Sequence, residues 1–237
     1  MKKEDKELIY DLLKKADANV NGYTSEAFKR EVTFEDEVVG SSPTMTTSSS
    51  EGLSLKDLNG KILRCTKCQL ARTRNNVVPG EGVENPLVLV IGEGPGYDED
   101  MSGRPFVGKA GILLDKMLAA IDLDRNKNCY IANVVKCRPP NNRDPEPQEQ
   151  SACEGFLQAQ IHILKPKMIL CMGRIAGHKL LDSQTPLNQL RGQFFDYNGI
   201  PLMVTYHPSA LLRDEALKRP AWDDLKMFKK KLDELQI

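Results

Sequence analysis

Residues 87–100 read LVLVIGEGPGYDED, an unbroken apolar run followed at once by a glycine-rich loop and several acidic residues. Consecutive apolar residues from Leu87 to Ile91 are typical of a strand that is buried on both faces. The glycines at positions 92, 94 and 96 allow the backbone to approach a ligand closely and leave its N–H groups exposed. This stretch therefore predicts a central strand whose carboxyl end opens into a binding loop.

The chain that follows alternates between strand-like and helix-like patterns. Apolar runs predict strands at residues 130–135 and 168–172, and Asn198-Gly199 predicts a tight turn between two late strands. Helical spacing covers residues 108–121, 147–164, 175–181 and 222–235. The alternation predicts a three-layer α/β/α sandwich around a central, parallel-rich sheet, with ligands at the carboxyl ends of the strands.

Two further segments precede this domain. Residues 1–34 carry apolar side chains at helical spacing, so a helical N-terminal extension is expected. Residues 35–52 include a Ser/Thr-rich run that buries too little apolar surface to become ordered, which predicts a flexible linker. The α/β domain is expected to cover residues 53–237.

The overall charge is balanced, with 33 Lys and Arg against 33 Asp and Glu. Residues 1–51 hold seven basic and eleven acidic residues, so residues 52–237 carry a net charge of +4. Six basic residues between Leu55 and Gly80 accompany one acid, Asp57; they are Lys56, Lys61, Arg64, Lys67, Arg72 and Arg74. Such a stripe can neutralise phosphates, although a solvated basic face explains it equally well.

No apolar stretch approaches the ~20 residues that a membrane span requires, and no signal-peptide core follows Met1. A cytoplasmic protein without membrane contact is therefore expected. In that compartment cysteines are more often reduced, metal-bound or catalytic than paired in disulfides.

Four of the six cysteines show a metal-ligand pattern. Cys65 and Cys68 form a C-x2-C pair in a basic loop, Cys137 is expected at the end of the second strand, and Cys153 lies in the first half of the next helix. A close pair plus two distant thiolates suits either a cubane iron–sulfur cluster or tetrahedral zinc. Spacing alone leaves the choice of metal open.

Three residues near the strand ends are candidates for contact with a ligand. Phe106 lies in a loop, where it either packs or stacks on a base. Asn133 lies near the end of the second strand, and its amide suits the mixed donor–acceptor edge of a pyrimidine. His207 is the one histidine placed after a strand. A dinucleotide site is disfavoured, since acids and no expected helix follow Gly96.

Taken in order, five motifs resemble the iron–sulfur (family 4) uracil-DNA glycosylases over about Leu58 to Leu235. They are Cys65-x-x-Cys68, Gly92-Glu-Gly-Pro-Gly, Gly103-Arg-Pro-Phe-Val-Gly-Lys-Ala-Gly, Asn133-Val-Val-Lys-Cys-Arg-Pro-Pro and His207-Pro-Ser-Ala. The resemblance implies an enzyme that flips uracil out of DNA and hydrolyses its N-glycosidic bond. A non-catalytic reader of uracil or other deaminated bases in DNA is the alternative. A metal-stabilised interaction module accounts less well for Phe106 and His207.

The resemblance also implies roles for the base-binding residues. Phe106 would stack on the flipped uracil, Asn133 would bond to its polar edge, and the backbone around Glu93 and Gly94 would bind it from the other side. His207 would face the uracil O2 atom and stabilise the departing anion.

Roles in water activation, DNA contact and metal binding follow from the same resemblance. Many relatives carry an acid that orients the attacking water at the position where this chain has Gly94. The nearby acids Glu93, Asp98 and Glu99 are therefore the candidates for this role, with Glu99 alternatively crowding the C5 edge of the base. Leu211 or Leu212 would wedge into the gap in the DNA, and Arg213 would grip a phosphate. A 4Fe-4S cluster would be held by Cys65, Cys68, Cys137 and Cys153. The expected partner is uracil-containing DNA, single- or double-stranded, bound by a monomer.

Overall fold

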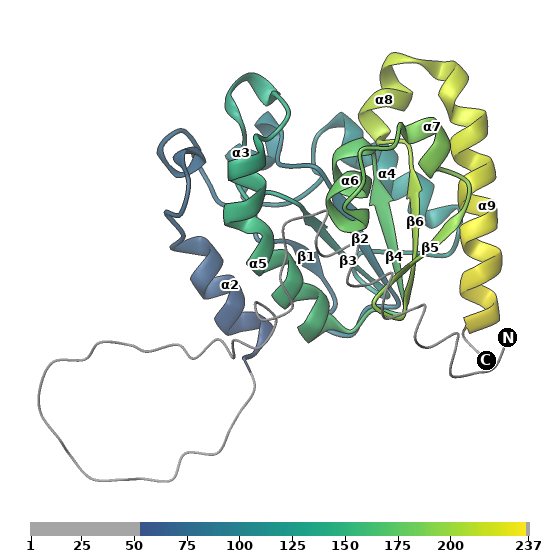
Figure 1. The fold of residues 1–237 in the computed structure, drawn as a ribbon, viewed down its shortest axis with the longest axis horizontal. Helices are drawn as coiled ribbons and strands as arrows, with labels where there is room; N and C mark the ends of the chain where they lie inside the picture. Colours follow the sequence, from purple (N-terminus) through teal and green to yellow (C-terminus); the bar gives the residue numbers. More distant parts are fainter. Residues whose placement is uncertain (1–52, 236–237) are drawn as a thin grey trace, which may run out of the picture. The chain divides into compact units, whose positions relative to one another are not determined.

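The apolar runs predicted as strands enter one six-stranded sheet (Figure 1). The computed structural model describes residues 53–235, so the predicted extension over residues 1–34 and the predicted linker over residues 35–52 lie outside the described residues. The strands are β1 (Glu81–Gly82), β2 (Val88–Gly92), β3 (Cys129–Asn133), β4 (Met168–Met172), β5 (Phe194–Tyr197) and β6 (Ile200–Thr205).

The sheet has the order β1-β3-β2-β4-β6-β5, and its four middle strands are parallel. The short edge strands β1 and β5 pair antiparallel with β3 and β6. The register places Gly92 beside Asn133, and Met172 beside Thr205. The carboxyl ends of β3, β2, β4 and β6 therefore meet at one edge, as expected for a site in an α/β sheet.

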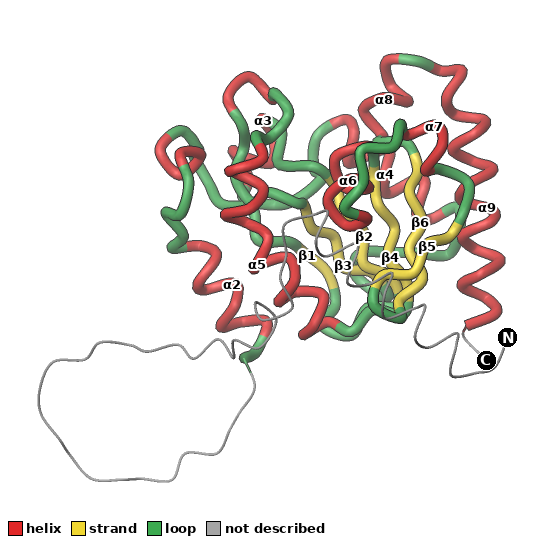
Figure 2. Tube along the Cα trace, viewed as in Figure 1, coloured by secondary structure: helices red, strands yellow, loops and turns green. Residues whose placement is uncertain are grey.

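Helices cover both faces of the sheet, which confirms the predicted three-layer sandwich (Figure 2). The α-helices are α2 (Leu55–Leu63), α3 (Tyr97–Ser102), α4 (Lys109–Ala119), α5 (Pro147–Leu164), α6 (Arg174–Leu181), α7 (Leu187–Leu190), α8 (Pro208–Arg213) and α9 (Lys218–Leu235). Short 3₁₀ turns are η2 (Gln69–Arg72), η3 (Pro140–Asn142) and η4 (Glu215–Leu217).

Alternate residues of each central strand pack into two separate hydrophobic cores, one on each face of the sheet. In β2, Leu89 and Ile91 pack towards α2, α5, α6 and α7, whereas Val88 and Val90 pack towards α4, α8 and α9. All four side chains are fully buried, which explains why this strand is continuously apolar.

Several element boundaries differ from those predicted. The second strand ends at Asn133 and not at Val135, so Cys137 lies in the following loop. Helix α9 begins at Lys218 rather than Trp222. Helix α3 opens directly after Gly96, so the argument that no helix starts there was wrong. Its first turn is acidic, which still disfavours a pyrophosphate.

Cys129 and Cys171, the two cysteines outside the metal-ligand pattern, are fully buried in β3 and β4 and serve as ordinary core residues. No helix within residues 53–235 is long and apolar enough to span a bilayer.

Candidate active site and candidate metal centre

A cleft of about 540 Å³ opens at the carboxyl edge of the sheet. It is formed by the segments that follow β2, β3, β4 and β6, and by the loop before α4. The predicted site residues in its lining are Glu93, Gly94, Glu99, Phe106, Asn133, His207 and Arg213. Residues up to 120 positions apart in the sequence, such as Glu93 and Arg213, therefore share one cavity because parallel strands end together.

Asn133 lies on the floor of the cleft as the last residue of β3. Its side chain is buried, and its Oδ1 atom has no hydrogen-bond partner within the described part of the chain. A Cβ atom at Gly92 would collide with this Oδ1 and with the Phe106 ring, so glycine is required for both side chains to reach the floor. A buried acceptor left without a partner is costly, and it marks a place where a ligand donor fits.

Phe106 forms one wall of the cleft and has a left-handed backbone, with φ of 52°. The buried Arg125 guanidinium fixes this conformation by donating to the carbonyls of Pro105 and Phe106, each at 2.9 Å. Arg125 also pairs with Asp115 at 2.7 Å. Sequence reasoning missed Arg125, because nothing in its local pattern connects it to a loop about 20 residues earlier.

Glu99 connects the glycine-rich loop to the Phe106 loop. One carboxylate oxygen accepts from the backbone N–H groups of Val107 (2.9 Å) and Gly108 (3.0 Å), and the other accepts from Gly96 (3.0 Å). This bonding suits a scaffold residue and not the predicted water-orienting group. Asp98 is exposed and outside the cleft lining.

His207 caps the N-terminus of α8. Its Nδ1 atom lies 3.1 Å from the Ser209 backbone nitrogen and 2.8 Å from Ser209 Oγ. A backbone amide can only donate, so Nδ1 is the acceptor and the proton of the neutral ring lies on Nε2. Burial, assisted by the positive charge of Arg213, lowers the pKa of His207 to about 4, although Glu99 opposes this shift. The site therefore holds a neutral imidazole, 5.5 Å from Phe106 between ring centroids.

Glu93 is the half-buried carboxylate that lines the cleft beside Gly94. Burial raises its pKa to about 7, and the nearby charge of Asp144 adds to this effect while Arg174 opposes it. Asp144 and Arg174 form an ion pair at 2.5 Å. Glu93 can therefore exchange a proton near neutral pH.

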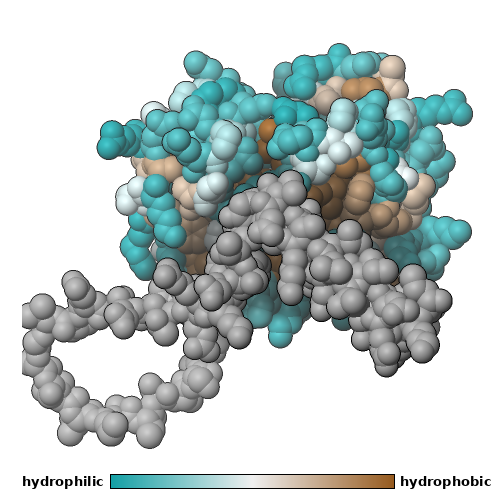
Figure 3. Space-filling view, in the orientation of Figure 1, coloured by the Kyte–Doolittle hydropathy of each residue, from teal (hydrophilic) through white to brown (hydrophobic). Residues whose placement is uncertain are grey.

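Two neighbouring leucines of α8 have opposite environments. Leu211 is buried in the core between α4 and α9, whereas Leu212 is 48% exposed. Of the two leucines proposed as the wedge, Leu211 packs in the core, which leaves Leu212 as the candidate for entering the DNA. Figure 3 shows hydrophobic residues exposed around α8 on a largely hydrophilic rim. Arg213 is also exposed and forms no ion pair within residues 53–235.

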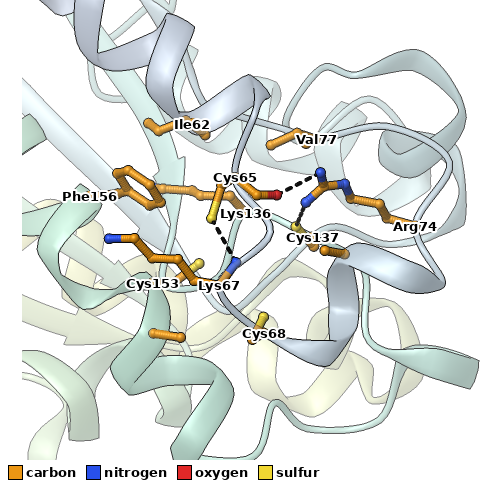
Figure 4. Close-up of a pocket in the computed structure, with 12 residues that line it drawn as sticks. Ile62, Cys65, Lys67, Cys68, Arg74, Val77, Lys136, Cys137, Cys153 and Phe156 are labelled. Carbon is orange, nitrogen blue, oxygen red and sulfur yellow. Dashed lines mark hydrogen bonds between the residues drawn. The ribbon is translucent and has the colours of Figure 1, made fainter. Parts of the chain in front are cut away.

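The four predicted metal-ligand cysteines line one pocket on the α2–α5 side of the sheet (Figure 4). Cys65 follows α2, Cys68 caps η2, Cys137 follows β3 and Cys153 belongs to α5. Arg74 turns inward from the basic run, donating to Cys137 Sγ at 3.1 Å and to the Cys65 carbonyl at 2.8 Å. Arg74 therefore belongs to this pocket and is not part of a solvated basic face.

Burial determines the protonation chemistry of the cysteine side chains in the pocket. Burial raises the pKa of the Cys137 thiol to about 11, although Arg74 opposes this shift, and burial also raises the pKa of Cys153. Thiols of this kind become thiolates when a metal coordinates them. Within residues 53–235 no group of three or more Cys, His, Asp or Glu side chains already has the arrangement of a metal-ion site. The donor set, four sulfurs around one pocket, nevertheless fits a soft metal centre.

Comparisons with a family model and with individual known proteins agree on one protein family. A family model described as "Uracil DNA glycosylase superfamily" matches residues 79–226. The "Type-4 uracil-DNA glycosylase" of Archaeoglobus fulgidus is 41% identical over 181 residues, which cover 73% of this chain and 90% of the relative. The proteins of the same name in Thermotoga maritima and Pyrobaculum aerophilum are 43% and 42% identical, and the matches cover 90% and 93% of those relatives.

Proposed function

The chain belongs to the uracil DNA glycosylase superfamily, and from that premise we propose that the cleft at the strand ends excises uracil from DNA. The substrate is uracil-containing DNA, and the products are free uracil and an abasic site. The family assignment disfavours the alternative of a non-catalytic reader.

The observation that carries the proposal is the buried Asn133 Oδ1 atom that has no partner within the described residues. Uracil offers an N3–H donor beside its O4 acceptor, and one amide group can pair with both atoms. Cytosine has an acceptor at N3 and a donor at the neighbouring position, so the same amide would face mismatched groups. Phe106 would stack on the flipped base against the glycine-lined floor.

The chemical step needs a donor for the departing base. When the bond between uracil N1 and the sugar C1′ breaks, its electron pair goes to the base and the sugar becomes oxocarbenium-like. His207 Nε2–H donates to uracil O2 in the proposed pose and stabilises the developing charge. A donor that is already neutral and held by Ser209 requires no reorganisation at the moment of reaction.

Water completes the reaction by adding to C1′ and losing a proton. Glu93 is the proposed group that orients this water, since its carboxylate lines the cleft and its pKa of about 7 suits proton transfer at neutral pH. Glu99 keeps the scaffold role described above. On the rim, exposed Leu212 would fill the gap left by the base and Arg213 would bind a phosphate.

The cysteine pocket would hold a four-iron cluster through Cys65, Cys68, Cys137 and Cys153. Iron rather than zinc is proposed because of the similarity to type-4 relatives, since the donor set permits either metal. Such a cluster would supply cross-linking and no redox step, tying the loop before η2 to α5 and to the segment after β3. Pure protein should be brown and should contain iron and sulfide.

The proposed function is tested by incubating the pure protein with a uracil-containing oligonucleotide and then cleaving abasic sites with alkali. We expect cleavage at the uracil position in single- and double-stranded substrates, and none in a matched thymine oligonucleotide. Tight binding of the uracil strand without any release of uracil would contradict the proposal and favour a reader.

A further inference from the structure

Lys136 lies between the cysteine pocket and the cleft, and the roles described above leave it unexplained. Its side chain is 1% exposed and lines the cysteine pocket. The Nζ atom donates to the backbone carbonyl of Asn133 at 2.8 Å and to Gln160 Oε1 at 2.6 Å. Gln160 is fully buried as well and donates to the Pro79 carbonyl at 2.8 Å. The ammonium is therefore held in place, with one bond to the residue proposed to read the base.

Both hydrogen-bond partners of Lys136 are neutral. A buried ammonium is costly unless negative charge lies nearby, and Lys136 forms no ion pair within residues 53–235. The available anionic groups are the thiolates of the pocket, where Cys137 is the next residue and Cys153 faces it from α5. Four thiolates outweigh the positive charge of an iron–sulfur core, so the loaded pocket would be negative.

We propose that Lys136 is the buried counter-charge of the cysteine-bound cluster and, through the Asn133 carbonyl, a positioning residue for uracil recognition. The inference rests on the proposed function, because it assumes a cluster in the pocket and uracil at Asn133. The Lys136 ammonium would then have two roles: together with Arg74 it offsets the negative charge of the loaded pocket, and it holds the end of β3. Cluster binding in the pocket and the position of Asn133 in the base site are then linked through the side chain of Lys136.

The test replaces the ammonium with a side chain of similar length, Lys136→Met, and uses the holoenzyme. Two quantities are measured well below the melting temperature: the rate at which a chelator bleaches the visible absorption of the cluster, and the affinity for free uracil. Loss of a group just outside the metal ligands typically costs 10- to 100-fold. We expect bleaching to accelerate by about that factor and uracil affinity to fall about tenfold.

Lys179→Met is the matched control. Lys179 is a half-buried lysine of α6 that pairs with Glu154 at 2.7 Å and lies outside both site linings. The same substitution there should leave bleaching and uracil affinity unchanged. A Lys136→Met protein that keeps the wild-type values for both quantities would overturn the inference, as would one in which only the melting temperature falls.

If Lys136→Met does not fold, a second variant tests the same charge role. Gln160→Glu is nearly isosteric and gives Lys136 a competing carboxylate, so it should also accelerate bleaching by about tenfold or more. Bleaching at the wild-type rate in Gln160→Glu would contradict the charge role. Wild-type protein that contains no iron, or that does not bind uracil, would instead contradict the proposed function itself.

Discussion

The cysteine pocket and the cleft at the strand ends differ in how fully their polar side chains are hydrogen-bonded. In the pocket, Arg74 is bonded to Cys137 and to a backbone carbonyl, and the nearby ammonium of Lys136 is bonded twice. In the cleft, the Asn133 acceptor has no partner within residues 53–235, and His207 keeps a proton on the nitrogen opposite its helix cap. The hydrogen-bonded basic side chains of the pocket suit a structural centre, whereas the unpaired acceptor and the available donor of the cleft suit recognition of a base.

The largest expected effect in the cleft comes from His207→Ala. Removing one preorganised donor to a developing anion should slow single-turnover excision by about 10²–10³. Binding of uracil-containing DNA should change much less, because the donor matters most once charge has developed. Excision under saturating enzyme, measured beside a melting curve, checks this. Normal melting together with a wild-type rate would remove His207 from the mechanism.

Asn133→Asp should have the next largest effect. The change replaces an amide donor by an acceptor and should reduce uracil excision by at least ~10² while turning the pocket towards cytosine, whose exocyclic amine donates. Paired rates on uracil and cytosine oligonucleotides measure the switch. If uracil excision is unchanged, the asparagine only supports the end of β3.

The pH profile should show a smaller effect, of about tenfold, that originates in Glu93. Its raised pKa of about 7 means that the ionised fraction grows as pH rises through neutrality, so the rate should increase between pH 6 and 8. His207, with a pKa lowered to about 4, stays neutral over this range and adds no change. Glu93→Gln should flatten the profile. A wild-type rate that does not vary with pH would assign the water to another group.

The two leucines of α8 provide the mildest and most selective comparison. Leu212→Ala should lower excision from double-stranded DNA by several-fold, with unchanged melting, because an exposed wedge is lost. Leu211→Ala should instead destabilise the fold by about 2–5 kcal/mol, as for other buried leucines, and leave the folded fraction active. Reversal of these two outcomes would show that the helix turns differently on DNA.

The parts of the fold that could be predicted from sequence are those carried by local patterns. The apolar run of β4 and the proline-started helix α5 have the predicted bounds. Adjacent helical residues point about 100° apart, so the choice between Leu211 and Leu212 depended on how α8 packs. Helix α2 was not predicted from the sequence, because Lys56, Asp57 and Asn59 make its first half largely polar.

Residues at the strand ends are the part of the candidate site that the pattern of strands and helices could place. Asn133 and His207 could be placed because parallel strands end at one edge. Arg125 and Lys136 could not be placed in this way. Arg125 donates to backbone carbonyls of the Phe106 loop, and Lys136 donates to the Asn133 carbonyl and to the distant Gln160 side chain. Nothing in the local sequence distinguishes a buried basic residue of this kind from a solvated one.

The proposed chemistry requires the cleft to present a neutral imidazole, with its proton on Nε2, to the departing base. Nitrogen-15 NMR of the histidine rings, assigned with His207→Ala, tests this claim most directly. At pH 7 His207 should show a protonated Nε2 and a bare Nδ1, and it should keep this form down to about pH 5, above its pKa of about 4. A ring that carries both protons at pH 7, or a proton on Nδ1, would contradict it.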